Sequence, residues 1–237
     1  MANSATPYTS EQLQQVSDRF ENSSPEAILR WAIEEFGPGL TMATAFGVEG
    51  CVLLAMLSEI PNGRDVRVFN LETGYQFPET LALRETIHEK YGIEVEYVRS
   101  RESVAEMERR FGGPIYGRDP DECCRIRKVE PLREALTGHT AWISAIRRDQ
   151  TPDRARSGIV EWDSKFNLVK VSPLANWTRG DAWAYAQINE VPYNPLHDRG
   201  FPSIGCWPCT HAVAEGEDER AGRWSSFAKL ECGLHSR

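Results

Sequence analysis

Residues 40–57 read LTMATAFGVEGCVLLAML and join two apolar runs through Gly47. The first run, LTMATAF, is compatible with a strand, and the second, VEGCVLLAMLSEI, predicts an apolar helix. A strand that leads through glycine into a helix N-terminus presents backbone N–H groups and the helix dipole to an anion, and glycine lets a phosphate approach closely. The sequence lacks GxxxxGK[ST], so this is not an ordinary P-loop. A tight turn without a ligand is the alternative interpretation.

Strands and helices alternate on both sides of this stretch. Upstream, SPEAILRWAIEEFG predicts a helix with Ser24 as N-cap, Pro25 at its first position and Gly37 just past its end. Downstream, a helix over 78–91, ended by Gly92, separates the strands VRVFNLE and IEVEYVR. TAWISAI, VEWD and FNLVKVSPL predict further strands, and TRGDAWAYAQINEV predicts a helix capped by Thr178. This rhythm is typical of an α/β fold with a doubly wound, mostly parallel sheet, whose ligand lies beyond the carboxyl ends of the strands.

The composition fits one domain with an appended tail. The chain has 237 residues, of which 41% are apolar and 26% charged. Periodicity is lost from Pro192 onward, and the last residues are charged. We therefore expect a main domain over residues 1–212 and a mobile C-terminal tail over 213–237. Residues 1–20 predict a helix with a frayed leader.

Charge and hydropathy narrow the class of protein. The first twenty residues lack the basic and apolar regions of a signal peptide, and the longest apolar run, at 51–57, is too short to span a bilayer. We expect a cytosolic protein with no membrane partner. The net charge of −8 argues against nucleic-acid binding but leaves room for a local basic pocket that binds a small anion.

Four of the six cysteines form two pairs. Cys123 and Cys124 are adjacent in DECCRIRKVEPL, and Cys206 and Cys209 form the CxxC of GCWPC. In a reducing compartment such thiols indicate metal ligands, and four of them suit a tetrahedral zinc or a four-iron cluster. Adjacent cysteines converge on one zinc only with strain, whereas a cubane offers each a separate iron, so the pattern favours a 4Fe-4S cluster. Cys51, inside the run CVLLAML, is interpreted as a core residue.

A further thiol, Cys232, lies near the end of the tail in KLECGLH. The cations around it in the sequence are Lys229, His235, Arg220 and Arg223. Positive charge raises the thiolate fraction of a cysteine, so Cys232 is a candidate nucleophile. An exposed cysteine without a role is the alternative, and a surface histidine without a role is the alternative for His235.

Other cations follow predicted strands or the cysteine pair. Lys128 comes shortly after Cys124, and IRRDQTPDR carries Arg147, Arg148 and Arg154. Arginine binds oxyanions through paired donors, so the set favours an anion pocket, although any one of them alone is more typical of a solvated surface.

Taken together, these residues resemble the adenylylsulfate and phosphoadenylylsulfate reductases of sulfate assimilation. The resemblance runs from about residue 40 to residue 235 and rests on motifs in the family's order: TAFGVEG, LETGYQFPET, the CC pair with its following Lys, RRDQTPDR, SPLANWTRGDAW, GCWPC and ECGLH. It implies an adenine nucleotide α-hydrolase type fold with a modified phosphate loop. That loop departs from the commoner SGAED form by having Gly50 in place of Asp and Phe46 in place of Ser.

The cysteine pairs are similar to those of the branch that binds a 4Fe-4S cluster and acts on adenosine 5′-phosphosulfate. The branch that uses the 3′-phosphorylated substrate generally lacks them. The resemblance therefore implies a thioredoxin-dependent adenylylsulfate reductase that releases sulfite and AMP through a Cys232 S-sulfonate. The two electrons come from thiols, which leaves the cluster a structural and electrostatic role.

The resemblance also implies the site residues. The cluster ligands are Cys123, Cys124, Cys206 and Cys209, and the catalytic residue is Cys232. The residues expected to bind substrate are Gly47, Glu49, Leu71, Thr73, Lys128, Arg147, Arg154, Arg220, Arg223 and His235. The expected partners are adenosine 5′-phosphosulfate and reduced thioredoxin, and the expected assembly is a homo-oligomer.

Three rival functions stay open. One is a reductase of the 3′-phosphorylated substrate, and another is a cluster-containing tRNA thiolase, against which the acidic balance and ECGLH speak. The third is a non-catalytic iron–sulfur or zinc redox sensor, which would keep its response when Cys232 is replaced.

Overall fold

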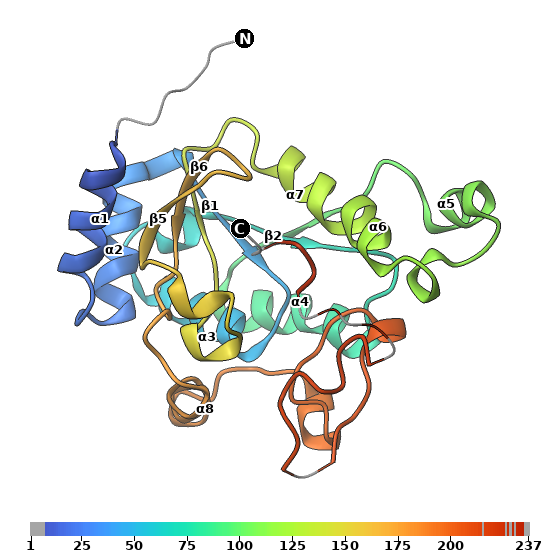
Figure 1. Cartoon of the computed structure of the whole chain (residues 1–237). Helices are drawn as coiled ribbons and strands as arrows, with labels where there is room; N and C mark the ends of the chain where they lie inside the picture. Colours follow the sequence, from blue (N-terminus) through green and yellow to red (C-terminus); the bar gives the residue numbers. More distant parts are fainter. Residues whose placement is uncertain (1–7, 215, 226, 228, 230, 235–237) are drawn as a thin grey trace.

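A computed structural model describes residues 8–214, 216–225, 227, 229 and 231–234. Its centre is a six-stranded sheet of order β3-β2-β1-β4-β6-β5 (Figure 1). The strands are β1 (Leu40–Thr44), β2 (Arg67–Leu71), β3 (Val95–Val98), β4 (Ala141–Ile143), β5 (Val160–Asp163) and β6 (Leu168–Val171). All neighbouring strands are parallel except β5 and β6. The predicted mostly parallel sheet is confirmed.

Helices cover both faces of this sheet. The helices are α1 (Ser10–Arg19), α2 (Pro25–Phe36), α3 (Val48–Glu59), α4 (Pro78–Tyr91), α5 (Val104–Phe111), α6 (Pro120–Cys124), α7 (Glu130–Ala135) and α8 (Arg179–Ile188). Buried residues of α2, α3, α4 and α8 share one core with Ile143 of β4, whereas α7 packs Leu132 against Trp142 on the opposite face. Successive strand residues point to opposite faces, so one strand serves both cores.

Local signals start and end the helices as the sequence predicts. The Ser24 hydroxyl accepts a hydrogen bond from the Ala27 amide at the start of α2, and Thr178 caps α8 in a capping box with Asp181. Gly92 ends α4 with a left-handed φ of 66°. Cys51 of α3 is buried, which confirms it as a core residue.

Helices α5, α6 and α7 were not predicted. The sequence carried a signal for α5, because Ser103 and Glu106 form a capping box at its start. Between α6 and α7, residues Arg125–Val129 form a π-helical turn directly after the adjacent cysteines. Such turns are rare in proteins as a whole, but those that occur are often found at functional sites. The extra residue in the turn rotates the side chains that follow.

The loop between β1 and α3 contains Gly47, which the sequence predicted as the residue that makes room for a phosphate, but its backbone and packing single out other residues. Phe46 is the residue with a left-handed φ, 54°, and its amide donates to the Thr44 hydroxyl at 3.0 Å. Gly47 is the N-cap of α3, with an ordinary φ of −68°. Gly50 is the glycine that packing requires, because a Cβ there would lie 2.6 Å from Thr44 Oγ1. The β1–α3 contact therefore depends on Gly50.

The sheet reverses its winding between β1 and β4, because β2 and β3 lie on one side of β1 and β6 and β5 lie beyond β4. A doubly wound sheet binds its ligand at such a point. Residues 231–234 return to this edge, where the dark red segment lies over β1 and β2 in Figure 1. Among the described residues, no helix has the length and apolar character to cross a membrane.

Candidate active site

A cleft of about 230 Å³ opens at the carboxyl ends of β1 and β4. It is lined by the β1–α3 loop, the end of β2, the loop after β4, and residues from three stretches beyond α8. The structure brings together most of the residues predicted for substrate and catalysis here: Gly47, Glu49, Leu71, Thr73, Lys128, Arg154, Arg220, Arg223 and Cys232. His235 lies outside the described residues.

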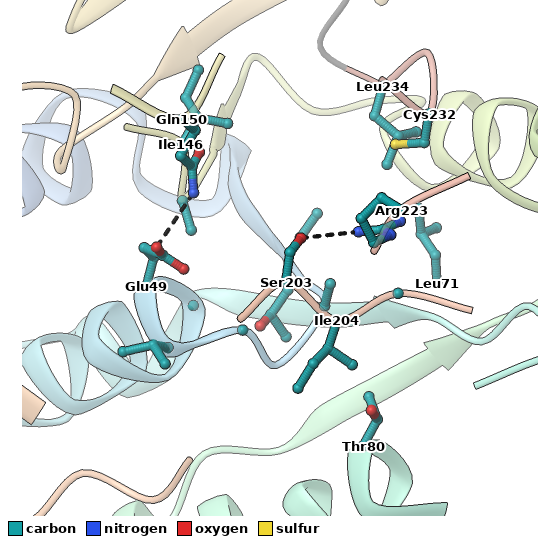
Figure 2. Close-up of a pocket in the computed structure, with 18 of the residues that line it drawn as sticks. Glu49, Leu71, Thr80, Ile146, Gln150, Ser203, Ile204, Arg223, Cys232 and Leu234 are labelled. Atoms are coloured by element: carbon teal, nitrogen blue, oxygen red, sulfur yellow. Dashed lines mark hydrogen bonds between the residues drawn. The ribbon is translucent and has the colours of Figure 1, made fainter. Parts of the chain in front are cut away.

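The two ends of the cleft differ in chemistry. Figure 2 shows Glu49 and Gln150 on one side, joined by a hydrogen bond of 3.3 Å, and Cys232, Leu234 and Arg223 on the other. Glu49 lies in the first turn of α3, where the helix dipole favours a carboxylate.

Arg147 does not line the cleft but lies behind Glu49, with its side chain only 2% exposed. Its guanidinium forms ion pairs with Glu49, with Asp149 at 2.9 Å and with Glu219 at 3.5 Å. Arg147 thus fixes the positions of Glu49 and Glu219, the two carboxylates that line the cleft and that we call its acidic wall. Direct contact between Arg147 and substrate stays a prediction.

The half-buried thiol of Cys232 faces several positive groups. Burial raises its pKa, but the Lys128 charge, the Leu234 amide hydrogen bond and the Arg154 charge more than offset this, so the pKa is lowered overall. Burial lowers the pKa of Lys128, but Cys206, Cys232 and Cys124 raise it by more when they are ionised, so Lys128 stays charged. A lowered pKa makes Cys232 a better nucleophile near neutral pH.

Arg223 and Arg220 enter the cleft from the loop after Cys209. The Arg223 guanidinium lies 4.4 Å from the ring centre of buried Trp224 and donates to the Ser203 hydroxyl at 3.3 Å. A Cβ at Gly205 would lie 2.3 Å from Arg223 Nη2, so only glycine leaves room for this guanidinium. Arg220 is also packed near the Trp224 ring, at 5.8 Å.

Arg154 meets Glu231, a residue that the sequence analysis did not single out. The Glu231 carboxylate accepts two hydrogen bonds of 2.8 Å from the Arg154 guanidinium. Burial raises the pKa of Glu231, but the charges of Arg154 and Arg220 lower it by a larger amount. The pKa is therefore lowered overall, and the carboxylate stays ionised. No periodicity or motif marks such a contact, which joins positions 77 residues apart.

The four paired cysteines line one small cavity beside the cleft, together with Lys128 and the aromatic residues Tyr75, Tyr116 and Trp224. All four thiols are free. Within the described part of the chain, no group of three or more His, Cys, Asp or Glu side chains is arranged to hold a single metal ion. Four cysteines around a common space instead of a common point suit a cluster whose irons each take one thiolate.

Burial dominates the protonation of the adjacent pair. It raises the pKa of Cys123 to about 12 and that of Cys124 to about 11, and ionisation of a neighbouring thiol would raise the pKa of Cys123 further. These thiols are protonated without a ligand, so binding a metal group would displace their protons.

Thr73 connects the cleft to this cavity. Its hydroxyl lies 3.3 Å from the Cys206 sulfur, and its carbonyl accepts a hydrogen bond of 2.7 Å from buried Arg127. Behind it, the rings of Tyr75, Tyr116 and Trp207 pack edge to face.

Two further residues of the cleft, Asn70 and Gln76, were not singled out by the sequence analysis. Asn70 Oδ1 and Gln76 Oε1 are buried without a hydrogen-bond partner among the described residues. Unsatisfied buried acceptors in a cleft suit a ligand that carries N–H or O–H donors, such as an adenine or a ribose.

Known proteins resemble this chain over most of its length. Residues 39–212 match the phosphoadenosine phosphosulfate reductase domain. A phosphoadenosine 5′-phosphosulfate reductase of Gloeobacter violaceus is 47% identical over 94% of this chain and 93% of its own. Adenosine 5′-phosphosulfate reductases of Salinibacter ruber and Bacillus subtilis are 41% and 44% identical, over 98% and 88% of this chain and 92% and 89% of their own.

Solved structures share the fold. A phosphoadenylyl-sulfate reductase from Candida auris, in a phosphate complex, superposes with a TM-score of 0.76 at 28% identity and covers 88% of this chain and all of its own. An FMN adenylyltransferase of Candida glabrata, at 16% identity, has a TM-score of 0.59 over 89% of this chain and 70% of its own, which shows the adenine nucleotide α-hydrolase-like fold alone. With its family domain and its near full-length relatives, the chain belongs to the phosphoadenosine phosphosulfate reductase family.

Proposed function

We propose that this protein reduces adenosine 5′-phosphosulfate to sulfite and AMP, with reduced thioredoxin as electron donor and Cys232 as nucleophile. The observation that carries the proposal is the position of Cys232 in the same cleft as the β1–α3 loop, beside Lys128 and two arginines. A nucleotide on that loop and a sulfur electrophile before Cys232 would occupy one continuous space. The relatives named adenosine 5′-phosphosulfate reductases support the reaction class.

The first step follows from the charges around Cys232. The thiolate attacks the sulfur of the phosphosulfate, an S–S bond forms, and the S–O bond to AMP breaks with its electron pair leaving on the phosphate oxygen. Lys128 and Arg223 line the cleft around this thiol, where they neutralise the developing negative charge. AMP is then free to leave, and Cys232 carries an S-sulfonate.

The second step needs an external thiol. A thiolate of reduced thioredoxin attacks the Cys232 sulfur, the S–S bond to the sulfonate breaks with its electron pair on sulfite, and a mixed disulfide forms. The second thioredoxin thiol resolves it and restores Cys232. Because Cys232 is partly buried in the cleft, the tail must open to admit a protein thiol. A mobile tail over residues 213–237 is thus part of the proposal.

A 4Fe-4S cluster bound by Cys123, Cys124, Cys206 and Cys209 is also part of the proposal. The shared cavity and the free thiols fit it. When bound, the cluster would supply fixed negative charge close to Lys128. The Thr73 hydroxyl would donate to the Cys206 thiolate, and the π-helical turn would hold Lys128 between cluster and cleft.

The substrate could carry a 3′-phosphate, since the Gloeobacter violaceus relative is named for that substrate. The four paired cysteines favour the unphosphorylated nucleotide. The deciding experiment is sulfite release by anaerobically purified protein with reduced thioredoxin, with the two nucleotides at matched concentration. A large preference for adenosine 5′-phosphosulfate is expected, and the opposite preference would make this a reductase of the phosphorylated form.

Replacement of the nucleophile separates a reductase from a redox sensor. Cys232→Ser should abolish sulfite release while iron content and nucleotide binding stay at the parent level. Absence of sulfite from the parent protein with either nucleotide would sink the proposal. A homo-oligomer in the cytosol stays a prediction, which sedimentation and cell fractionation test.

A further inference from the structure

The residue before the nucleophile forms a buried ion pair with the body of the protein. Glu231 Oε1 and Oε2 accept hydrogen bonds of 2.8 Å from Nε and Nη2 of Arg154, and Oε1 also accepts one of 3.0 Å from the Thr151 hydroxyl. Arg220 adds an ion pair at 3.7 Å. Paired, charge-assisted hydrogen bonds of this kind fix both the distance and the orientation of the two groups.

The two partners belong to different parts of the chain. Arg154 begins a short 3-10 helix, Arg154–Arg156, and its amide is tied to the Thr151 carbonyl at 3.0 Å. Its guanidinium also donates to Gln150, which reaches Glu49 on α3. Arg154 is therefore anchored to the nucleotide end of the cleft, and Glu231 connects this anchor to Cys232 through a single peptide bond.

Burial separates this pair from the ion pair of Lys229 with Asp121, which also joins the tail to the body of the protein. The side chains of Arg154 and Glu231 are 9% and 5% exposed, whereas Asp121, the partner of Lys229, is 81% exposed. Water and salt compete with an exposed pair but not with a buried one, and breaking one partner of a buried pair leaves the other charge uncompensated. Of these two contacts, only Glu231 with Arg154 can hold the tail firmly.

We propose that Glu231 is a positioning residue that latches the tail to Arg154 and so holds the Cys232 sulfur against the sulfur of the bound substrate. This inference rests on the proposed function of Cys232. It assigns Arg154 a new role: with the tail closed, Nε and Nη2 bind Glu231 and Nη1 binds Gln150, so the guanidinium receives the tail.

The latch and a purely electrostatic role predict opposite results. The Glu231 charge raises the pKa of Cys232, so its loss by itself would give more thiolate and a faster first step. Loss of a latch instead lets the thiol leave its attack position, and misplacement by about 1 Å costs on the order of 100-fold in rate. The sign of the change therefore separates the two roles.

The test measures the two half-reactions separately with Glu231→Gln in the cluster-loaded protein. Formation of the S-sulfonate from adenosine 5′-phosphosulfate, without reductant, is followed by quenched-flow and intact-protein mass. Sulfite release from the isolated adduct is followed with dithiothreitol. We expect the first rate to fall by roughly 10- to 100-fold and the second to stay unchanged or rise. Arg154→Gln should behave alike, and the double variant should be no slower than the slower single variant.

A matched control removes an exposed carboxylate of the same tail. Glu217→Gln, whose exposed side chain accepts a hydrogen bond from the Ala214 amide, should leave both steps unchanged. A first step in Glu231→Gln that is as fast as the parent's or faster would overturn the latch. An equal fall of both half-reactions would also overturn it, because a latch acts only while the tail is closed.

A second readout does not depend on the reaction. Iodoacetamide should alkylate Cys232 faster in Arg154→Gln than in the parent, as quantified on the tail peptide. Loss of the Arg154 charge by itself would raise the pKa of Cys232 and slow alkylation, so a faster rate reports release of the tail. Equal alkylation rates would overturn the latch. If the parent forms no S-sulfonate from either nucleotide, the proposed function fails, and the alkylation rates alone still decide whether Glu231 holds the tail.

Discussion

The Thr73 hydroxyl lies 3.3 Å from the Cys206 sulfur and connects the cleft to the cysteine cavity across 133 positions of sequence. The same hydroxyl accepts a hydrogen bond of 3.1 Å from the Tyr75 amide. It can therefore direct its own proton to the sulfur when Cys206 is a thiolate. A hydrogen bond to a ligand sulfur lowers the free energy of the bound cluster and tunes its potential.

Thr73→Val should weaken binding of the proposed cluster. The variant keeps the side-chain shape but loses a hydrogen bond to a charged acceptor, which is worth about 1.5–3 kcal/mol. Iron content after purification and the rate of bleaching in air measure the effect. Thr73→Ser retains the hydroxyl and should behave like the parent. Equal bleaching of the valine and serine variants would show that the contact does not support the cluster.

Lys128→Met should raise the pKa of Cys232. Burial already raises this pKa, and the Lys128 charge is the largest effect that lowers it. Because the thiolate is the nucleophile, the alkylation rate of Cys232 rises with pH through the thiol pKa, and loss of Lys128 moves that rise to higher pH. At any pH below the pKa of Cys232, each unit by which that pKa rises lowers the alkylation rate about tenfold. Lys90→Met, outside the cleft, should leave the profile in place; an unmoved profile in Lys128→Met would contradict the assignment.

Gly50→Ala should distort the β1–α3 junction. The new Cβ would lie 2.6 Å from Thr44 Oγ1, and relief of such overpacking costs about 1–3 kcal/mol of the free energy of unfolding. The denaturant concentration at the midpoint of unfolding and the affinity for AMP should both fall. Gly180→Ala is the matched control, because its Cβ would meet Thr178 Oγ1 at an ordinary 3.6 Å in α8, where alanine is the better helix former. A stable Gly50→Ala protein with parent affinity would refute the packing requirement.

Arg147→Met should lower stability more than loss of an exposed arginine. Its side chain is 2% exposed between Glu49, Asp149 and Glu219, and removing one partner of a buried ionic network costs about 3–5 kcal/mol. Arg99→Met removes a pair with Glu72 from a side chain that is 60% exposed and should cost no more than about 1 kcal/mol. Urea midpoints measure both. Equal midpoints in the two variants would show that Arg147 is not a structural element of the acidic wall.

Much of the fold could be predicted because its signals are local. Ser24, Gly92 and Thr178 act on backbone groups a few positions away, so the sequence places the helix ends directly. The strands were found by their apolar runs. Helix α5 had a comparable signal at Ser103, whereas the π-helical turn after Cys124 has no sequence pattern and depends on packing around the cavity.

The sequence by itself determined the alternation of the strands with helices α2, α3, α4 and α8, the grouping of four cysteines into a CC and a CxxC motif, and the candidate nucleophile, since each depends on residue type and short spacing. Tertiary structure alone decided that Phe46 takes the left-handed turn, that Arg147 lies behind Glu49, and that Glu231 receives Arg154. The last two of these join side chains from separate elements. Their geometry follows from how the layers pack, because burial turns an ordinary surface charge into one that must find its partner.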